Sequence, residues 1–287
     1  MEVNKVLVIG AGTMGRGIAQ WFSQQSIKVE LIDNVSEMAH KSKALIHESW
    51  DKLALKNKFS NSQVSEFKKC LHISSIEDHS TDADLVIEAI IEDKKIKEEL
   101  FLKLDKHMKP ECILASNTSS IPITSIARNL SSERKKRTLG LHFFNPAPIM
   151  KLVEIIKTPW VEQDLQQDLY TMFEKLGKKP AFCNDSPGFI VNRVARNFYG
   201  EAFHLLGNYD QEQIKEIDQV MTRVGGFRMG PFTLMDLIGI DVNYSVTKSV
   251  WESYYFEPRF RPHKIQREMV ESGRIGKKAH EGFYQYE

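Results

Sequence analysis

Short apolar runs alternate with amphipathic stretches over residues 1–185 of the chain. The runs are rich in valine, leucine and isoleucine and are bounded by polar or turn residues, which is typical of buried strands. Strands are therefore predicted at Lys5–Gly10, Lys28–Asp33, Asp84–Ile90, Thr138–Phe144, Lys151–Lys157 and Pro180–Cys183, with one more opening the segment ILASNTSSIP at 113–122.

The stretches between these runs carry apolar residues at helical spacing, as from Met14 to Phe22. Ser36 is the expected N-cap of a long charged helix. Strands that alternate with helices imply right-handed βαβ units, and hence a parallel sheet whose ligands bind at the carboxyl ends of the strands. The expected helices are Glu37–Lys58, one that ends near His107, and Glu162–Leu176.

The pattern changes after NDSPGF (184–189), where helical periodicity continues with few strand signals. Pro187 and Gly188 predict a boundary at this point. The expected organisation is α/β, with a doubly wound sheet domain at 1–185 followed by an all-α domain at 189–287. The helices predicted in the second domain are Ile190–Leu206, Gln211–Val224, Pro231–Ile238, Val242–Tyr255 and Pro262–Ser272.

The composition narrows the choice of partners and compartment. The 287 residues include 39 lysines and arginines against 38 acidic residues, so the net charge of +1 favours neither a nucleic-acid nor a membrane partner. No apolar stretch approaches the roughly 18 to 20 residues that span a bilayer. Cys70, Cys112 and Cys183 form no CxxC pair, and the start MEVNKVLVIG does not resemble a secretory signal. A soluble, cytoplasmic protein is expected.

A glycine motif lies between the first predicted strand and the first predicted helix. Gly10, Gly12 and Gly15 form G-x-G-x-x-G, with Thr13 and Met14 inside it. The first glycine makes the turn, the second lets the backbone approach a pyrophosphate, and the third lets the helix pack on the strand. Such turns also occur without a ligand, but this position favours a Rossmann-like dinucleotide site, with the helix N-terminus facing the phosphates.

Asp33 ends the second predicted strand, about 20 residues after the first glycine. A carboxylate at this place accepts hydrogen bonds from the hydroxyls of the adenine ribose and repels a 2′-phosphate. The next residue is Asn34 and not an arginine, so NAD is preferred over NADP as the cofactor. The alternative for Asp33 is a solvated acid at the end of a strand.

Two further polar segments fall at predicted strand ends. Asn117, Thr118 and Ser119 follow one strand, where turn formation and helix capping explain them equally well. The segment LHFFNPAPIMKLVEII (141–156) places His142 and Glu154 among apolar residues. An unpaired buried carboxylate is costly, so Glu154 is expected to have a partner.

Six segments together resemble the L-3-hydroxyacyl-CoA dehydrogenase family in its stand-alone short form: GAGTMGRGIA, EAIIEDKKIKEELF, SNTSS, GLHFFNPAPIMKLVEII, DSPGFIVNR and GPFTLMDLIGID. The resemblance covers nearly the whole chain in order. Many dehydrogenases share the glycine motif, whereas HFFNP combined with PGFIVNR is highly specific. The tail RFRPHKIQREMVESGRIGKK is similar to bacterial 3-hydroxybutyryl-CoA and 3-hydroxyadipyl-CoA dehydrogenases.

The resemblance implies NAD-dependent interconversion of (S)-3-hydroxyacyl-CoA and 3-oxoacyl-CoA, with 3-hydroxybutyryl-CoA and acetoacetyl-CoA as the expected pair. Oxidising the alcohol requires a base for the hydroxyl proton while a hydride leaves for the nicotinamide. His142 is the expected base, and Glu154 on the next strand is expected to orient its ring and stabilise the imidazolium. Ser119 and Asn192 are implied to donate hydrogen bonds to the substrate oxygen, although Asn192 could instead cap a helix.

The resemblance also implies several binding residues. Asn145 is expected beside His142 and the nicotinamide, and Asn117 at the cofactor. Glu92 and Lys97 are implied to lie near the cofactor, and Ser49 and Lys56 near the coenzyme A portion. The alternative for these four residues is a solvated position on a charged helix face. The all-α domain is expected to bind the substrate and to form a homodimer.

No metal is expected, because the other histidines lack a ligand spacing such as HExxH: His40, His47, His72, His79, His107, His204, His263 and His280. Ala279, His280 and Glu281 replace the glycine-rich ending of the family, so the conformation of the terminal turn is not predicted.

Three other functions compete with the one that the resemblance implies. They are a 3-hydroxyadipyl-CoA dehydrogenase of aromatic degradation, a lysine-based dehydrogenase of free β-hydroxy acids, and a non-catalytic NAD-binding relative.

Overall fold

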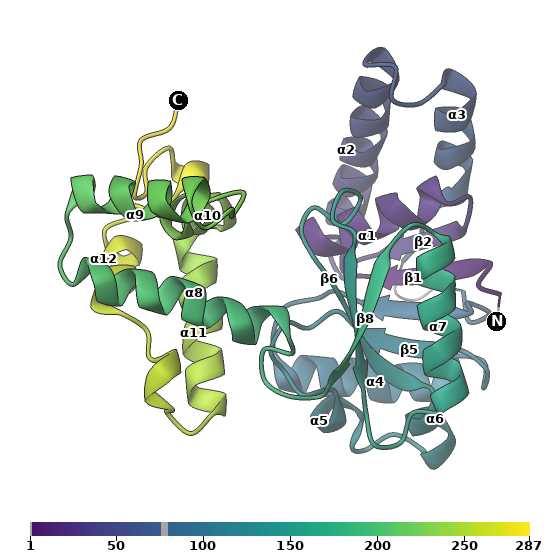
Figure 1. Ribbon diagram of the computed structural model, residues 1–287. Helices are drawn as coiled ribbons and strands as arrows, with labels where there is room; N and C mark the ends of the chain where they lie inside the picture. Colours follow the sequence, from purple (N-terminus) through teal and green to yellow (C-terminus); the bar gives the residue numbers. More distant parts are fainter. Residues whose placement is uncertain (1, 76–79) are drawn as a thin grey trace. The chain divides into compact units, whose positions relative to one another are not determined.

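The computed structural model describes residues 2–75 and 80–287 of the chain (Figure 1). The backbone divides into two compact units, one ending at Ser186 and the other beginning at Pro187. The first is an α/β unit and the second is helical. A Rossmann-like domain followed by a helical C-terminal domain is the fold class that the sequence predicts.

The first unit is built on one eight-stranded sheet with the order β3-β2-β1-β4-β5-β6-β7-β8. Each of the strands that the sequence predicts is present, with ends that differ by at most two residues. The strands are β1 (Lys5–Ile9), β2 (Lys28–Ile32), β3 (Leu71–Ile73), β4 (Leu85–Glu88), β5 (Ile113–Ser116), β6 (Thr138–Phe143), β7 (Leu152–Lys157) and β8 (Lys179–Asn184).

The expectation of a wholly parallel sheet is wrong at one pair of strands. The strands β1 to β6 are parallel to one another, but β7 runs antiparallel to β6, and β8 is parallel to β7. A parallel return requires a crossover of a dozen or more residues. The segment 144–151 is too short for that, so the chain turns back beside β6.

Helices cover both faces of the sheet because side chains alternate along each strand. Val6 and Val8 of β1 face a core that includes residues of α1 (Thr13–Gln24), α2 (Ser36–Leu55), α3 (Asn61–Cys70) and α7 (Gln163–Lys175). Leu7 and Ile9 face a second core that includes residues of α4 (Lys94–His107) and α5 (Ile123–Ala127). The strands are therefore buried on both faces, as their continuous apolar sequence requires.

Several local expectations need correction. Ser36 is the first residue of α2 and not its cap: the N-cap position is Val35, and no side chain caps it. The helices α3, α5 and α6 (Ser132–Lys136) and the strand β3 were not expected. The start of α3 shows a capping box, in which Ser60 and Gln63 satisfy each other's backbone N–H groups.

The second unit packs its helices around an aromatic core. Phe203, Phe232 and Phe283 are fully buried, with ring centroids 4.9 to 5.9 Å apart. No helix within residues 2–75 and 80–287 is both long and apolar enough to cross a membrane. The helices of this unit are α8 (Val191–Leu206), α9 (Gln211–Arg223), α10 (Pro231–Ile238), α11 (Ile240–Ser253) and α12 (Lys264–Glu271), with short 3-10 turns at Pro258–Phe260 and Lys277–Ala279.

The terminal segment is ordered despite its altered glycine pattern. Asp236 of α10 is 1% exposed, and its carboxylate accepts hydrogen bonds from the backbone N–H groups of Phe283 and Tyr284, both at 2.9 Å. His280 takes a left-handed conformation with φ of 61°. The chain can therefore turn at a non-glycine residue, because the following backbone is anchored to α10.

Candidate active site

The glycine turn has the geometry that each glycine was expected to provide. Gly10 has φ of +101°, and a Cβ there would lie 2.5 Å from the carbonyl oxygen of Ala89. A Cβ on Gly15 would lie 1.7 Å from the carbonyl oxygen of Gly10, so α1 packs directly on the turn. A Cβ on Gly12 would meet nothing within 4 Å, which leaves an open face at the N-terminus of α1. This open face, with no side chain capping α1, suits a bound pyrophosphate.

Asp33 lies beside this turn, directly after β2. Its Oδ2 accepts a hydrogen bond from the backbone N–H of Ala11 at 2.7 Å, and its Oδ1 accepts one from Val35 at 3.0 Å. The carboxylate therefore holds the glycine turn to the end of β2. Its position at the carboxyl end of the strand is where a ribose-binding acid is expected.

A buried ion pair supports the next strand end. Nζ of Lys97, a residue of α4, lies 2.5 Å from Glu88 Oε1 and 3.2 Å from Glu92 Oε2. The side chains of Lys97 and Glu88 are 1% and 0% exposed. Lys97 is therefore not on a solvated helix face. Burial alone would raise the pKa of Glu92, but Lys97 and hydrogen bonds from Thr118 and Ser119 outweigh burial and lower it.

The SNTSS segment forms a turn that is tied to both neighbours. Glu92 Oε1 accepts hydrogen bonds from Thr118 Oγ1 at 2.6 Å and from the backbone N–H of Ser119 at 3.1 Å. Asn117 Oδ1 accepts a hydrogen bond from the backbone N–H of Phe143 at 2.8 Å. The structure thus brings Glu92, Lys97, Asn117 and Ser119 together at the edge where β4 and β5 end, next to the strand of His142.

His142 and Glu154 face each other across the antiparallel pair β6–β7. His142 Nδ1 lies 2.6 Å from Glu154 Oε2, and the two residues are 6% and 0% exposed. The imidazole ring also packs against Phe144, with ring centroids 4.5 Å apart. Because the two residues are partners in the strand register, the backbone itself sets their spacing.

Two further predicted residues belong to other segments of the described chain. Asn145 is exposed, in the loop that follows β6. Asn192 belongs to the helical unit, where it is the second residue of α8 and not its N-cap, which is Ile190. The roles of both residues in the reaction stay predictions.

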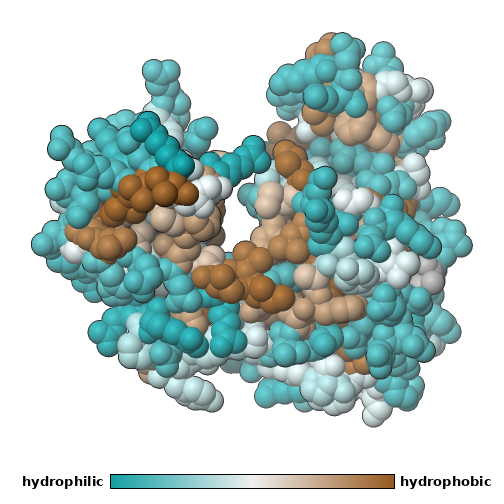
Figure 2. All heavy atoms as spheres, viewed as in Figure 1, coloured by the Kyte–Doolittle hydropathy of each residue, from teal (hydrophilic) through white to brown (hydrophobic). Residues whose placement is uncertain are grey.

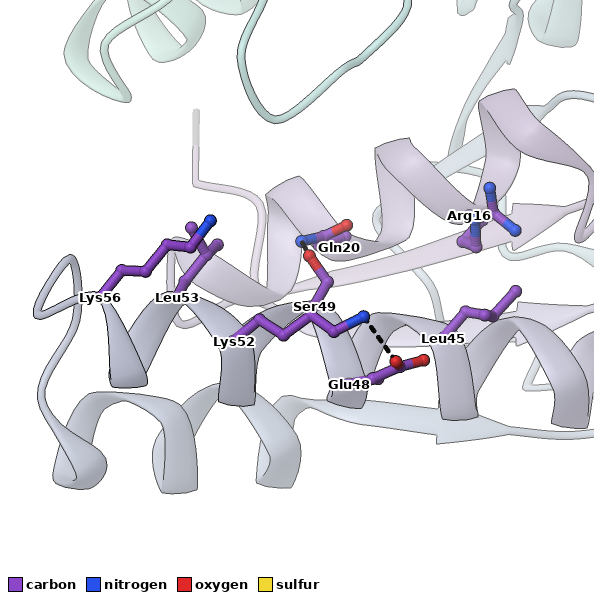
Figure 3. A pocket seen from close by; sticks show the side chains of 8 residues that line it. All are labelled: Arg16, Gln20, Leu45, Glu48, Ser49, Lys52, Leu53 and Lys56. Carbon is purple, nitrogen blue, oxygen red and sulfur yellow. Dashed lines mark hydrogen bonds and ion pairs between the residues drawn. The ribbon is translucent and has the colours of Figure 1, made fainter. Parts of the chain in front are cut away.

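Ser49 and Lys56 line a groove between α1 and α2 with a volume of about 410 Å³ (Figure 3). Ser49 accepts a hydrogen bond from Gln20 at 3.2 Å. Arg16, Lys52 and Lys56 bring three positive charges to the groove, and Glu48, which pairs with Lys52 at 2.6 Å, brings one negative charge. The surplus of positive charge favours an anionic ligand.

Within the described parts of the chain, no group of three or more histidine, cysteine or acidic side chains could hold a metal ion. His79, one of the histidines considered above, lies outside the described residues.

The sequence reasoning missed two residues of these sites. Glu88 is a charged residue within the apolar segment DLVIEAI, the same kind of signal that singled out Glu154 in KLVEII. Arg16 follows the glycine motif directly and lines the groove of Figure 3. No pattern in the sequence alone pairs Arg16 with residues of α2.

The glycine turn, the acid after β2 and the His142–Glu154 pair together define an NAD-binding dehydrogenase of the Rossmann class. Residues 5–186 match the family model of the 3-hydroxyacyl-CoA dehydrogenase NAD-binding domain, and residues 188–286 match that of the C-terminal domain. The chain belongs to the 3-hydroxyacyl-CoA dehydrogenase family, and it is an oxidoreductase that uses NAD.

Individual relatives agree with this assignment. The chain is similar to the mitochondrial hydroxyacyl-coenzyme A dehydrogenase of Sus scrofa, with 41% identity over 99% of this chain and 91% of the relative. It is 39% identical to the 3-hydroxyadipyl-CoA dehydrogenase of Escherichia coli, over 100% of this chain and 60% of the relative. The chain is also similar to (S)-3-hydroxybutyryl-CoA dehydrogenase from Ralstonia eutropha in its crystal structure. This match has a TM-score of 0.90 and 34% identity, and it covers 100% of each chain.

Proposed function

We propose that the chain interconverts (S)-3-hydroxybutyryl-CoA and acetoacetyl-CoA, with His142 and Glu154 as the acid–base pair. The observation that carries the proposal is the buried contact of 2.6 Å between His142 Nδ1 and Glu154 Oε2. A glutamate in this position stabilises an imidazolium and fixes the proton of the neutral ring on Nδ1. The other ring nitrogen, Nε2, is then the atom that takes up the hydroxyl proton of the substrate.

NAD supplies the hydride acceptor in this reaction. In the oxidation, His142 removes the hydroxyl proton as the carbonyl forms, and in the reduction the imidazolium returns a proton to the new alkoxide. Ser119 and Asn192 are proposed to donate hydrogen bonds to the oxygen at the reacting carbon, where charge develops. Asn145 is proposed to contact the nicotinamide beside His142.

The glycine turn and Asp33 are proposed to hold the pyrophosphate and the adenine ribose. Gly10, Gly12 and Gly15 shape the turn. Thr13 and Met14 are the first two residues of α1 and provide backbone N–H groups at its N-terminus. Asn117, Glu92 and Lys97 are proposed to complete the cofactor site at the next strand ends.

The groove between α1 and α2 is proposed to hold the coenzyme A portion of the substrate. Coenzyme A carries several phosphate charges, and the groove has more positive than negative side chains. Ser49 and Lys56 are proposed as its contacts, with Ser49 as a hydrogen-bonding group and Lys56 as a point charge.

A homodimer formed by the helical domain is a further part of the proposal. Apolar side chains that are more than half exposed occur on α8, α9 and α10 and after α11, and Figure 2 shows hydrophobic residues on the surface of this unit. Exposed apolar surface of this kind favours association. The apolar side chains that are more than half exposed include Val194, Leu205, Val220, Leu237, Tyr255 and Phe256. Light scattering should give twice the chain mass, and a monomer would contradict the proposal.

A cytoplasmic location is also proposed. Cys70, Cys112 and Cys183 are free thiols in the structure, as is usual for proteins of reducing compartments.

An absorbance assay with acetoacetyl-CoA and NADH tests the proposed function. Turnover with NADH, and much less with NADPH, is the expected result, whereas no turnover would favour a non-catalytic relative. A second candidate is 3-hydroxyadipyl-CoA, the substrate named for the Escherichia coli relative. Comparing kcat/KM for 3-hydroxybutyryl-CoA and 3-hydroxyadipyl-CoA separates the two substrates.

A further inference from the structure

Lys178 is a buried lysine directly before β8. It is 5% exposed, whereas the next residue, Lys179, is exposed. Its backbone N–H donates to the carbonyl oxygen of Phe173 at 2.9 Å, so the C-terminal turn of α7 fixes where the side chain starts. A buried ammonium group requires polar partners, because its transfer from water is costly.

The partners of Lys178 are two backbone carbonyls and two aromatic rings. Its Nζ donates hydrogen bonds to the carbonyl oxygens of Ala147 at 2.5 Å and Met150 at 2.7 Å. It also lies 4.5 Å from the ring centroid of Trp21 and 5.8 Å from that of Phe143. No carboxylate of the described residues forms an ion pair with it, and burial lowers the pKa of Lys178 to about 8.

Both carbonyls belong to the loop 144–151, which connects the strand of His142 to the strand of Glu154. The loop carries Asn145 and forms a turn in which Ile149 N donates to Pro146 O at 3.0 Å. The loop also packs on α1, because a Cβ built on Gly17 would lie 3.4 Å from Ala147 Cβ. The loop therefore contacts both α1 and the Lys178 side chain.

We propose that Lys178 is a positioning residue, whose amine holds the loop 144–151 so that Asn145 meets the cofactor beside His142. The inference rests on the proposed function, which gives Asn145 its cofactor contact. Lys178 itself touches no substrate or reacting atom. A neutral amine still has two N–H groups for the two carbonyls, so the loop is held on both sides of the pKa.

Lys178→Met tests the proposal, and Lys179→Met is the matched control. Methionine has nearly the length of lysine but no donor, so the buried carbonyl of Ala147 loses its partner. The dissociation constant of NADH, measured by its fluorescence, should rise about tenfold in Lys178→Met, as expected if the displaced loop costs the hydrogen bond of Asn145 to the cofactor. It should stay within about twofold of wild type in Lys179→Met.

Two more readouts separate positioning from general damage. The KM for acetoacetyl-CoA should stay near its wild-type value, and amide hydrogen exchange should become faster in peptides covering 144–151 and not in β1 or α4. A misfolded fraction would lower the apparent kcat and leave the NADH affinity of the folded molecules unchanged.

Equal NADH affinity in the Lys178→Met and Lys179→Met variants, or unchanged exchange of 144–151, would overturn the proposal. Failure of the proposed function is distinct, because the wild-type protein would then bind NADH without reducing acetoacetyl-CoA.

Discussion

Glu154 and Glu88 are both fully buried acids within apolar strands of the same sheet, yet their surroundings differ. Glu154 contacts a histidine, with 2.6 Å between Oε2 and Nδ1 of His142. Glu88 contacts a lysine, which also lies 3.2 Å from a second carboxylate, that of Glu92. An imidazole can act as a general acid or base, whereas the ammonium group of Lys97 forms ion pairs with both carboxylates. In the proposed function, the buried acid therefore serves acid–base chemistry at the first site and supports the cofactor-binding turn at the second.

Glu154→Gln should have the largest effect on catalysis. Glutamine keeps the shape of the side chain but can neither stabilise an imidazolium nor enforce the tautomer of His142. Turnover of acetoacetyl-CoA should fall at least about 100-fold, with NADH affinity unchanged. Steady-state kinetics and NADH titration measure both quantities. Full activity in this variant would show that His142 acts without Glu154.

Glu88→Gln should affect stability more than the chemical step. Removing one partner of a buried ion pair leaves the other charge poorly compensated, so the free energy of unfolding should fall by about 3 kcal/mol. Urea denaturation of this variant beside Glu154→Gln provides the comparison. The contrast between the two glutamates fails if Glu88→Gln reduces kcat as strongly as Glu154→Gln without loss of stability.

Asp33→Ala should change cofactor choice by a smaller factor. The carboxylate repels a 2′-phosphate, so its loss should reduce the preference for NADH over NADPH by about tenfold. Asp33→Asn is the matched control, because it removes the charge but keeps an acceptor for the N–H of Ala11. If the wild-type protein already prefers NADPH, the assignment of the ribose site is wrong.

The smallest effect concerns pH and Lys178, a buried cation with no carboxylate partner within residues 2–75 and 80–287. Its pKa is about 8 in the folded protein and 10.5 ordinarily. Below about pH 8 the amine is protonated in both the folded and the unfolded protein. Between pH 8 and 10.5 the folded protein has released this proton, whereas the unfolded protein still holds it. Stability should therefore rise with pH in this window, by about 1 kcal/mol more in wild type than in Lys178→Met. Denaturation curves at about pH 7.5 and 9.5 test this, and parallel changes in both proteins would contradict it.

Much of the fold follows from local patterns in the sequence. The apolar runs predict seven of the strands, and the switch to helical periodicity after residue 184 separates the two kinds of unit. The antiparallel turn at 144–151 was missed because strand direction depends on the length of the connection, and the apolar pattern of β7 is the same in either direction. The helices α5 and α6 have only five residues each, too few for a periodicity to show.

The candidate site was predictable where one residue breaks a strong pattern. Glu154 stands out in KLVEII, and the contact with His142 confirms that it has a partner. Glu88 breaks DLVIEAI in the same way, but its partner Lys97 is on a helix rich in lysine and glutamate. Which lysine turns inward depends on the packing of α4 against the sheet, and the sequence pattern of that helix does not encode it clearly. The same holds for Lys178, whose neighbour Lys179 is exposed.

The tautomer of His142 distinguishes a histidine oriented by Glu154 from one that acts alone. Nitrogen-15 NMR of the labelled protein distinguishes a protonated from an unprotonated ring nitrogen. We expect the neutral ring to carry its proton on Nδ1, toward Glu154, and to have a lone pair on Nε2 for the substrate hydroxyl. In Glu154→Gln, we expect the two tautomers to be mixed or their preference reversed. A neutral His142 with its proton on Nε2 in the wild-type protein would contradict the proposed acid–base role, because a protonated Nε2 cannot accept the hydroxyl proton of the substrate.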